Sequence, residues 1–490
     1  MYEDYAPSAD TTWTQRVLRH LDTDPDQPAL VEATADGAAA WSRAQLRRLI
    51  AGALDLFDEV AVPTGAAVPA LLTTRPASVA ALVAGALSDR PLAPLAPRMT
   101  RPELLTCLAE LPGDVLLAEP SSTELAHDVA AATGKRVVLV GDDLAGDRPL
   151  EPGTDPDRPA LVMHTSGTTG RPKRVAAREF ALGRRADVNG YLLDIRPGDR
   201  VVTTSLFHHV GGLGNLAVAL GNGAAVVLFP AFSVDAWRML EQVGPTQAVT
   251  IPSVLEMLLA ADALASSTMR RIAYGASPIH PQTMRRIQEV LPDVAFVNLF
   301  GQTEGSPVAT LSPADHRAAA AGQEHLLESV GRPAPGVELV IHEPDADGVG
   351  EVWARSPHSF LVDDEGWQHT GDLGRLVDGF LYLVGRRGDK IIRGGENVYP
   401  LEVEQVLAMH PAVRDVVVVG IPDRRLGETI KAFVVPAGTA APDAEDLRRF
   451  TRERLAGFKV PVEWEFLDEM PRNANGKILR RQLAAAARLS

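Results

Sequence analysis

Cysteine is nearly absent from the 490-residue chain, which contains only Cys107. A single thiol cannot form an internal disulfide, so the sequence does not resemble a disulfide-stapled secreted protein and fits a reducing compartment, the cytoplasm. Cys107 lies in the run LLTCLAEL, an apolar helical pattern. We therefore expect a buried structural thiol there and not a catalytic nucleophile.

Long apolar runs are also missing. The longest candidate, residues 216–232, is interrupted by Gly221, Asn222 and Gly223, and a membrane-spanning helix needs about 20 apolar residues in a row. The first ten residues, MYEDYAPSAD, are acidic and have no apolar core. The sequence thus predicts neither a signal peptide nor a membrane partner.

Positive charge is scarce relative to negative charge. Formal net charge is −15, and no long basic run occurs. Such a chain repels a phosphate backbone, so nucleic acid is not expected as a partner. Any anionic small molecule must bind at a local positive exception. Length and a hydrophobic share of 46% are typical of a soluble protein with a large core and more than one domain.

Strand-like and helix-like segments alternate in the N-terminal part. Residues 66–95 read as a strand, a helix and a second strand, and residues 11–59 as a helix, a strand pair and a second helix. The second helix opens at Ser42, with Gln45 three residues later as a capping box. A βαβ rhythm predicts a parallel sheet covered by helices, which is an α/β fold.

The most informative stretch is residues 161–175, LVMHTSGTTGRPKRV, where a short strand runs into a loop of hydroxyls and glycines. Glycines let backbone N–H groups approach a polyphosphate, and a lysine adds a compact charge. A polar surface turn is the alternative. A Walker loop is excluded because Pro172 separates the last glycine from the lysine. The candidate phosphate-binding residues are Thr165, Ser166, Gly167, Thr168, Thr169, Gly170 and Lys173.

The wording TSGTTGRPK resembles the signature loop of the adenylate-forming superfamily, which includes acyl-CoA synthetases, peptide-synthetase adenylation domains and luciferases. Further motifs follow in the order of that family. The family usually has glycine after the lysine, where this chain has Arg174. The resemblance implies a large N-terminal α/β domain of sheets layered with helices and a small, mobile α+β lid domain.

A second motif, SLFHHVGGLGN, follows a strand ending near Thr204. Its two histidines could be metal ligands, but no cysteine or carboxylate stands at ligand spacing; solvent-facing turn histidines are a further alternative. The segment resembles the acyl-CoA synthetase pattern whose histidine gates the acid pocket, which assigns that role to His209. The aspartate with which peptide-synthetase domains hold an ammonium is absent. A plain carboxylic acid is therefore favoured over an α-amino acid.

Two motifs resemble the adenine and phosphate segments of the family. In IAYGASP, Gly275 and Ala276 would let a flat base approach the backbone. In VAFVNLFGQTEGSP, the resemblance implies that one aromatic side chain stacks on adenine, a hydroxyl bonds a phosphate oxygen and a carboxylate holds Mg²⁺. Taken alone, Thr-Glu after a strand would be a surface turn. The residues assigned by this motif are Asn298, Phe300, Gly301, Thr303 and, for the metal, Glu304.

The C-terminal motifs complete the resemblance. Asp372 in TGD and Arg386 in GRRGDK would contact the ribose, the aspartate through charge-assisted hydrogen bonds. Gly388 stands where the family usually has Asp or Lys, the pivot of the lid, and glycine can absorb a large dihedral change. We place the domain boundary there, giving an ATP- and acid-binding domain (1–387) and a lid (388–490). Lys477 would swing into the active site; alternatively it is a solvated lysine.

Together the motifs predict a ligase of the acyl-CoA synthetase branch. It would use ATP, Mg²⁺ and coenzyme A, activate a small carboxylic acid as acyl-AMP with release of pyrophosphate, and pass the acyl group to the CoA thiol as the lid turns. Loading of a carrier-protein phosphopantetheine arm is the alternative acceptor reaction. A non-catalytic nucleotide-binding homologue and a P-loop ATPase are alternatives of other classes; the retained motif residues and the missing Gly-Lys-[Ser/Thr] sequence disfavour them.

Overall fold

The computed structural model describes residues 2, 4–10, 12–166, 172–264, 268–438, 442–472 and 478–489. The chain forms two compact units. The first consists of residues 1–338 and 355–368, and the second of residues 339–354 and 369–490. Each unit has its own hydrophobic clusters.

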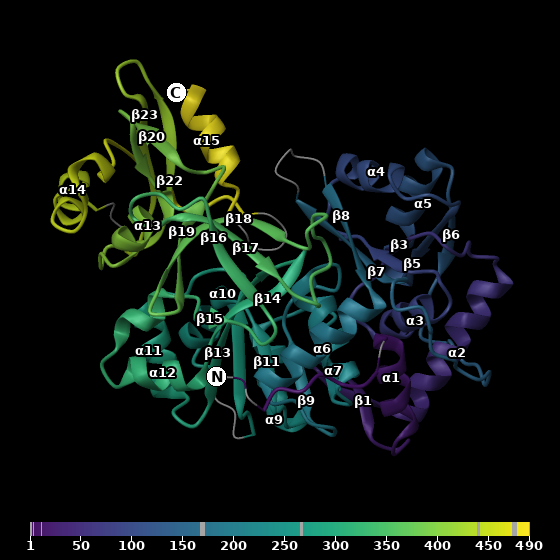
Figure 1. Cartoon of the computed structure of the whole chain (residues 1–490). Helices are drawn as coiled ribbons and strands as arrows, with labels where there is room; N and C mark the ends of the chain where they lie inside the picture. Colours follow the sequence, from purple (N-terminus) through teal and green to yellow (C-terminus); the bar gives the residue numbers. More distant parts are fainter. Residues whose placement is uncertain are drawn as a thin grey trace. The chain divides into compact units, whose positions relative to one another are not determined.

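A nine-stranded sheet is the centre of the first unit (Figure 1). Its six central strands, from β13 to β1, are parallel, and antiparallel strands close both edges. In spatial order the strands are β15 (Arg332–Pro333), β14 (Gly305–Leu311), β13 (Ala295–Gln302), β12 (Arg271–Gly275), β11 (Gln247–Thr250), β9 (Arg200–Thr203), β10 (Ala225–Leu228), β1 (Pro28–Thr34) and β2 (Gly37–Ser42).

A six-stranded sheet is the second sheet of this unit. Its first five strands are parallel, and β8 pairs with β7 in antiparallel fashion. The order is β6 (Arg136–Leu139), β5 (Val115–Ala118), β3 (Val68–Leu71), β4 (Leu92–Pro94), β7 (Pro159–Ser166) and β8 (Pro172–Arg178). The strands β3 and β4 are parallel and joined by helix α3, as the alternating pattern of residues 66–95 predicts.

Helices cover the sheets, and local sequence signals explain where several begin. Ser42 caps α2 with the predicted capping box to Gln45, and α3 and α10 begin at Pro76 and Pro252, since proline is well suited to the first turn. The helices are α1 (Trp13–Asp22), α2 (Arg43–Glu59), α3 (Pro76–Leu87), α4 (Arg101–Ala109), η1 (Pro120–Ser122), α5 (Thr123–Thr133), α6 (Glu179–Leu193), η2 (Val210–Gly214), α7 (Asn215–Gly221), α8 (Val234–Arg238), α9 (Leu240–Val243), α10 (Pro252–Ala260), α11 (Pro281–Val290), α12 (Pro313–Ala320) and η3 (Glu324–Glu328).

The second unit contains almost all of a four-stranded sheet together with a five-stranded sheet and its helices. The long pair β22–β23 is antiparallel, and β24 adds in parallel to β23. The elements are β16 (Glu338–His342), β17 (Gly350–Arg355), β18 (Gln368–Val377), β19 (Phe380–Arg386), β20 (Ile391–Arg393), β21 (Glu396–Val398), α13 (Pro400–Ala408), β22 (Val413–Asp423), β23 (Gly427–Pro436), α14 (Ala444–Arg452), η4 (Gly457–Lys459), β24 (Glu463–Phe466) and α15 (Arg480–Leu489).

The predicted fold class is confirmed: a large N-terminal α/β part is followed by a smaller C-terminal part. The compact units do not divide at a single position, because residues 339–354 and 369–387 pack with the C-terminal unit. A lid that turns about Gly388 stays a prediction.

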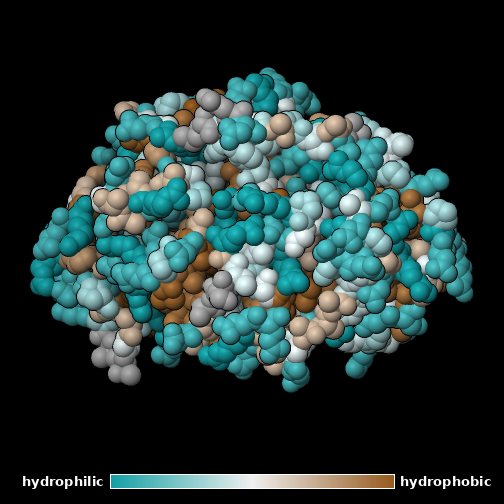
Figure 2. Space-filling model, turned by 90° about the horizontal axis from the view of Figure 1, so that it is seen from below, coloured by the Kyte–Doolittle hydropathy of each residue, from teal (hydrophilic) through white to brown (hydrophobic). Residues whose placement is uncertain are grey.

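The prediction that Cys107 is a buried structural thiol is tested by its exposure. Cys107 is 1% exposed, and burial raises the pKa of its thiol to about 11, which fits an inert structural residue. Among the described residues, every helix is too short or too polar to cross a bilayer. The face drawn in Figure 2 is mostly hydrophilic, with hydrophobic areas set between polar ones.

Candidate active site

Three of the sequence-predicted segments follow strands of the parallel part of the nine-stranded sheet. His209 comes six residues after β9, Gly275 ends β12, and Phe300 lies near the end of β13. The three strands run in the same direction, β12 directly beside β13 and β11 between β9 and β12. Ligands of parallel α/β sheets bind at the carboxyl edge. The structure therefore brings these segments to one edge.

The predicted adenine segment requires a glycine for a visible reason. A Cβ atom added to Gly275 would lie 2.3 Å from the carbonyl oxygen of Leu299 on the neighbouring strand, a distance that no side chain tolerates. The next residue, Ala276, is exposed and has φ of +69°, in the left-handed region. The glycine thus permits close approach of β13, and the chain leaves β12 abruptly after it.

Asn298, on β13, is a buried member of the predicted nucleotide set, at 8% exposure. It pairs in register with Tyr274 on β12. The Tyr274 hydroxyl lies 2.9 Å from Nε2 of His316, whose Nδ1 is 2.8 Å from the carbonyl of Ser312. Burial lowers the pKa of His316 to about 4, so the ring is neutral, Nδ1 donates to the carbonyl and Nε2 accepts the phenol proton. This packed pair fixes the strand that bears Asn298.

Thr303 and Glu304 form the two-residue turn between β13 and β14, because Gln302 pairs with Gly305. Both are half-buried. A Cβ atom on Gly301 would lie 2.7 Å from Cβ of Ser306, so this hairpin needs glycine at that position. The Glu304 carbonyl accepts the backbone N–H groups of Phe360 at 2.6 Å and Leu361 at 3.2 Å. Residues far along the chain therefore hold the turn in place.

His209 caps a single π-helical turn, η2. Its Nδ1 accepts a hydrogen bond from the N–H of Gly211 at 3.3 Å, and its carbonyl accepts the N–H groups of Gly212 and Leu213. Because Nδ1 is an acceptor, the proton of the neutral ring is on Nε2. Gly212 is required here, since a Cβ atom would lie 2.1 Å from the carbonyl oxygen of Leu206. The half-buried ring is thereby held in one orientation.

The signature loop lies only partly within the described residues. The strand that precedes the loop, β7, extends to Ser166, and β8 begins at Pro172. Thr165 pairs with Lys173 in this hairpin, and its Oγ1 lies 3.4 Å from the Lys173 carbonyl. Lys173 is exposed. Nothing further is described for the side chain of Ser166, and Gly167, Thr168, Thr169 and Gly170 lie outside the described residues.

The second unit places two predicted ribose contacts together. Asp372 and Arg386 are cross-strand partners of β18 and β19, and Nε of Arg386 donates to Oδ1 of Asp372 at 2.8 Å. Asp372 is 6% exposed. Gly388 lies in the turn that follows, is exposed, and has nothing within 4 Å of an added Cβ. Lys477 lies outside the described residues.

The described side chains fit Mg²⁺ binding in only one mode, through few carboxylates together with the oxygens of a substrate phosphate. Within the described residues no group of three or more His, Cys, Asp or Glu side chains could hold a metal ion. Mg²⁺ is commonly bound through one or two carboxylates and the oxygens of a substrate phosphate. The turn of Thr303 and Glu304, with one hydroxyl and one carboxylate, suits that mode.

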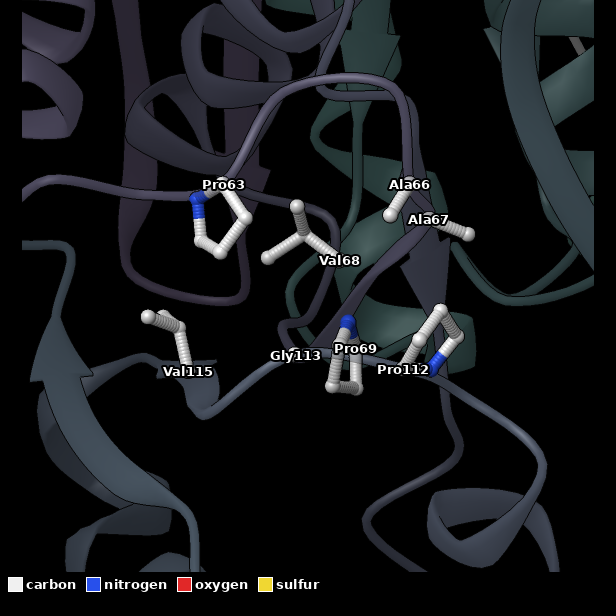
Figure 3. A pocket seen from close by; sticks show the side chains of 8 residues that line it. All are labelled: Pro63, Ala66, Ala67, Val68, Pro69, Pro112, Gly113 and Val115. Carbon is white, nitrogen blue, oxygen red and sulfur yellow. The ribbon is translucent and has the colours of Figure 1, made fainter.

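A hollow at the N-terminal ends of β3 and β5 in the first unit is not a second site. The volume available inside to a water-sized molecule is about 10 Å³, which is room for one water at most. Figure 3 shows a lining of prolines, small residues and valines without a titratable group, namely Pro63, Ala66, Ala67, Val68, Pro69, Pro112, Gly113 and Val115.

Comparison with known families decides the assignment. The family described as "AMP-binding enzyme" matches residues 17–362, and "AMP-binding enzyme C-terminal domain" matches residues 402–477. The chain belongs to the AMP-binding enzyme family. The resemblance drawn from the motifs is thus confirmed.

Relatives of this AMP-binding enzyme differ in their acceptors. It is 35% identical over 433 residues to a fatty acid–[acyl-carrier-protein] ligase of Streptomyces coeruleorubidus, covering 81% of this chain and 82% of the relative. It is 33% identical over 511 residues to an indoleacetate–CoA ligase of Aromatoleum aromaticum, covering 95% and 97%. The family is that of adenylate-forming acid ligases, and several relatives are CoA ligases.

Solved structures match nearly the whole length of this AMP-binding enzyme. An amide bond synthetase from Marinactinospora thermotolerans superposes with a TM-score of 0.86 at 30% identity, covering 97% of this chain and 99% of the other. An O-succinylbenzoate coenzyme A synthetase from Bacillus subtilis, solved in complex with ATP and magnesium ion, gives 0.83 at 29%, covering 96% and 98%. These likenesses support ATP and Mg²⁺ as ligands of the fold.

Two features of this AMP-binding enzyme were not predicted from its sequence. The segment of His358 and Phe360 reaches the Thr303–Glu304 turn from more than fifty residues away, and no local pattern announces such a contact. Arg185 of α6 is buried although charged. The sequence signal for this feature is an arginine within a largely apolar helical segment.

Proposed function

We propose that this AMP-binding enzyme activates a carboxylic acid as an acyl adenylate, with release of pyrophosphate, and transfers the acyl group to coenzyme A. The observation that carries the proposal is the placement of His209, Gly275 and the Thr303–Glu304 turn after strands that end at one edge of a parallel sheet. Such an edge is where α/β folds bind nucleotides.

The first half-reaction needs positioning and charge neutralisation more than covalent chemistry. In the proposal, Gly275, Ala276 and Phe300 receive the adenine, and the hydroxyl of Thr303 bonds a phosphate oxygen. Glu304 would hold a Mg²⁺ ion, which when bound supplies positive charge to the phosphate oxygens. Asn298 and Gly301 shape the same strand end.

In the proposal, further residues bind the phosphates and the ribose. Thr165 and Lys173, on the β7–β8 hairpin, and the loop between them would hold the departing phosphates. Asp372 would accept hydrogen bonds from the ribose hydroxyls, with Arg386 fixing its carboxylate through the 2.8 Å contact. Lys477 would stabilise the charge on the attacking carboxylate and the α-phosphate.

The acid would bind on the side of the His209 turn. The His209 ring is held through Nδ1, which accepts the N–H of Gly211. Burying the ammonium of an α-amino acid without a carboxylate partner costs several kcal/mol. A simple carboxylic acid is therefore the proposed substrate class.

The acceptor in the second half-reaction is proposed to be coenzyme A, whose thiol would attack the adenylate after the lid turns about Gly388. The 95% coverage at 33% identity with a protein named as a CoA ligase supports this choice. A carrier-protein arm is the second candidate, because a protein named as an acyl-carrier-protein ligase is 35% identical over 81% of the chain.

Two assays test the proposal. Acid-dependent exchange of radiolabelled pyrophosphate into ATP reports the first half-reaction, and a non-catalytic nucleotide-binding protein would give none with any acid. Competition between coenzyme A and a holo carrier protein for the adenylate, read by mass spectrometry of both products, then identifies the acceptor. Acyl-CoA is the expected product; an exclusively acylated carrier protein would replace the proposed acceptor.

A further inference from the structure

Arg185 differs from the other buried arginines of the described residues because two of its nitrogen atoms have no hydrogen-bond partner. It lies on α6 and is 3% exposed, yet its Nε and Nη1 atoms have no hydrogen-bond partner. Arg16, at 4% exposure, pairs with Asp187 and donates to the Gly221 carbonyl. Arg43, also at 4%, donates to two backbone carbonyls. Burying a charge without a partner is unfavourable, and such groups are retained where they act.

The two carboxylates of α6 interact with groups other than Arg185. Asp187 accepts from both Arg16 and Arg184. Glu179 accepts the N–H of Thr14 at 2.9 Å and lies 3.6 Å from Arg158. Burial alone lowers the pKa of Arg185 to about 10, and no carboxylate contributes to it. The guanidinium remains charged at neutral pH without a counter-ion within the described residues.

The surroundings of the guanidinium are a glycine, an aromatic ring and a neutral imidazole. A Cβ atom on Gly214 would lie 3.0 Å from Nη2 of Arg185, and the Cζ atom lies 5.9 Å from the centre of the Phe360 ring. Nε2 of His358 donates to the Pro307 carbonyl at 2.8 Å, which leaves Nδ1 as an acceptor without a partner. Burial and, to a smaller extent, the charge of Arg185 lower the pKa of His358 to about 4, so its imidazole is neutral.

The position links Arg185 to the candidate active site. Gly214 ends the η2 turn that begins after His209, and α6 packs beside α7, which follows that turn (Figure 1). Phe360 donates its N–H to the carbonyl of Glu304. The guanidinium thus contacts both the segment assigned to the acid and the segment that holds the Glu304 turn.

We propose that Arg185 binds a second anionic group of the acid, so that the substrate carries another carboxylate, or an equivalent oxyanion, besides the one that is activated. The planar fork of a guanidinium matches a carboxylate with two parallel hydrogen bonds. This inference rests on the proposed function and narrows its substrate class from simple acids to dianionic ones.

The reacting carboxylate is a poorer match for this site. A guanidinium that grips both oxygens by two hydrogen bonds stabilises the ground state of the nucleophile and opposes its attack. Such a grip is harmless on a spectator group, where it contributes binding and orientation. The spectator carboxylate also supplies the counter-ion that the buried charge lacks.

The test compares matched acids that differ by one carboxylate: hexanoate and adipate, benzoate and terephthalate, and phenylacetate and 4-carboxyphenylacetate. Pyrophosphate exchange gives kcat/KM for each acid in wild-type enzyme, in Arg185→Met and in the control Arg184→Met. Arg184 is the neighbour on the same helix, and its charge is already paired with Asp187. Loss of a charge-assisted contact predicts that the dianion-to-monoanion ratio falls about 10- to 100-fold in Arg185→Met only.

Thermal unfolding supplies a readout that does not need turnover. Adipate, terephthalate or 4-carboxyphenylacetate should raise the melting temperature of the wild-type chain and of Arg184→Met, but not of Arg185→Met. Without ligand, Arg185→Met should melt at or above the wild-type temperature, since it removes an unpaired buried charge. A purely structural arginine would instead lower it.

The outcomes separate the two levels of the proposal. Exchange with monoanionic acids at an unchanged ratio in Arg185→Met overturns the role of Arg185 and leaves the proposed function standing. A dianion-induced rise in melting temperature that requires Arg185, without exchange for any acid, supports the anion site and overturns the proposed function. A wild-type enzyme that favours no dianion in either assay overturns the inference.

Discussion

Arg386 donates from Nε to Oδ1 of Asp372 at 2.8 Å, across directly paired positions of β18 and β19. The side chain of Asp372 is 9% exposed and that of Arg386 is 47% exposed. A nearly buried carboxylate held by an exposed arginine keeps one orientation. This is the arrangement expected of a carboxylate that binds two neighbouring hydroxyls.

The first prediction concerns this pair. Asp372→Asn and Arg386→Met should each raise KM for ATP, by about 10-fold or more for the aspartate, because charge-assisted hydrogen bonds to the ribose are lost or misaligned. The two effects should not add in the double variant, since both act through one carboxylate. Arg387→Met is the control, because Arg387 pairs with Glu351 instead. An equal rise in KM for ATP in the control would remove the ribose role.

The second prediction concerns Gly388 as a pivot. Its added Cβ meets nothing within 4 Å, so Gly388→Ala should fold and retain both half-reactions. Gly388→Pro locks φ and restricts Arg387 as well. Adenylation and thioester formation, measured separately by pyrophosphate exchange and by acyl transfer from a pre-made adenylate, should then change by different factors. If Gly388→Pro and Gly388→Ala had the same rate of adenylation and the same rate of thioester formation, Gly388 would not be the hinge.

The third prediction separates the two nitrogens of His209. Asparagine offers an oxygen that can replace the Nδ1 acceptor of the η2 turn, but it has no counterpart of Nε2. His209→Asn and His209→Ala should both impair acid activation or the following step, while ATP binding, measured by calorimetry, changes little. Full activity in His209→Asn with loss in His209→Ala would mean that the histidine serves only as a cap.

The fourth prediction is a pH dependence of stability. Glu179 is fully buried, and burial raises the pKa of its carboxyl to about 7 from an ordinary value of 4.5. Between pH 4.5 and 7 the unfolded chain releases this proton while the folded chain keeps it, so stability falls as pH rises, by up to about 1.4 kcal/mol per unit. Glu179→Gln should remove this slope from urea unfolding curves. Glu124→Gln, a change at an exposed position, should keep the slope. Equal slopes in the wild-type chain and in both variants would contradict the assignment of the slope to Glu179.

Local signals in the sequence predicted much of the fold. Ser42 with Gln45 predicted a helix start that the structure confirms. The alternation of residues 66–95 predicted parallel strands, and the apolar setting of Cys107 predicted its burial. These features depend on neighbours within a few residues, which is why a single sequence contains them.

Long-range relations were beyond the sequence. Residues 161–175 predicted a short strand followed by a loop, whereas Thr165 and Lys173 are paired in a hairpin because β8 adds a partner strand. The contact of Phe360 with the Glu304 carbonyl and the isolation of Arg185 depend on packing between distant segments. Motif order identified candidate residues; the sheet determined which of them meet at one edge.

The central claim, that the chain forms an acyl adenylate, is tested most directly by acid-dependent pyrophosphate exchange with wild-type enzyme and Lys477→Ala. Exchange should occur with carboxylic acids and be much weaker with free α-amino acids. It should fall by about 10²–10³-fold or more in Lys477→Ala, while acyl transfer from a pre-made adenylate is far less affected, because the ammonium is needed while the adenylate forms. No exchange with any acid, or equal loss of both half-reactions, would contradict the account.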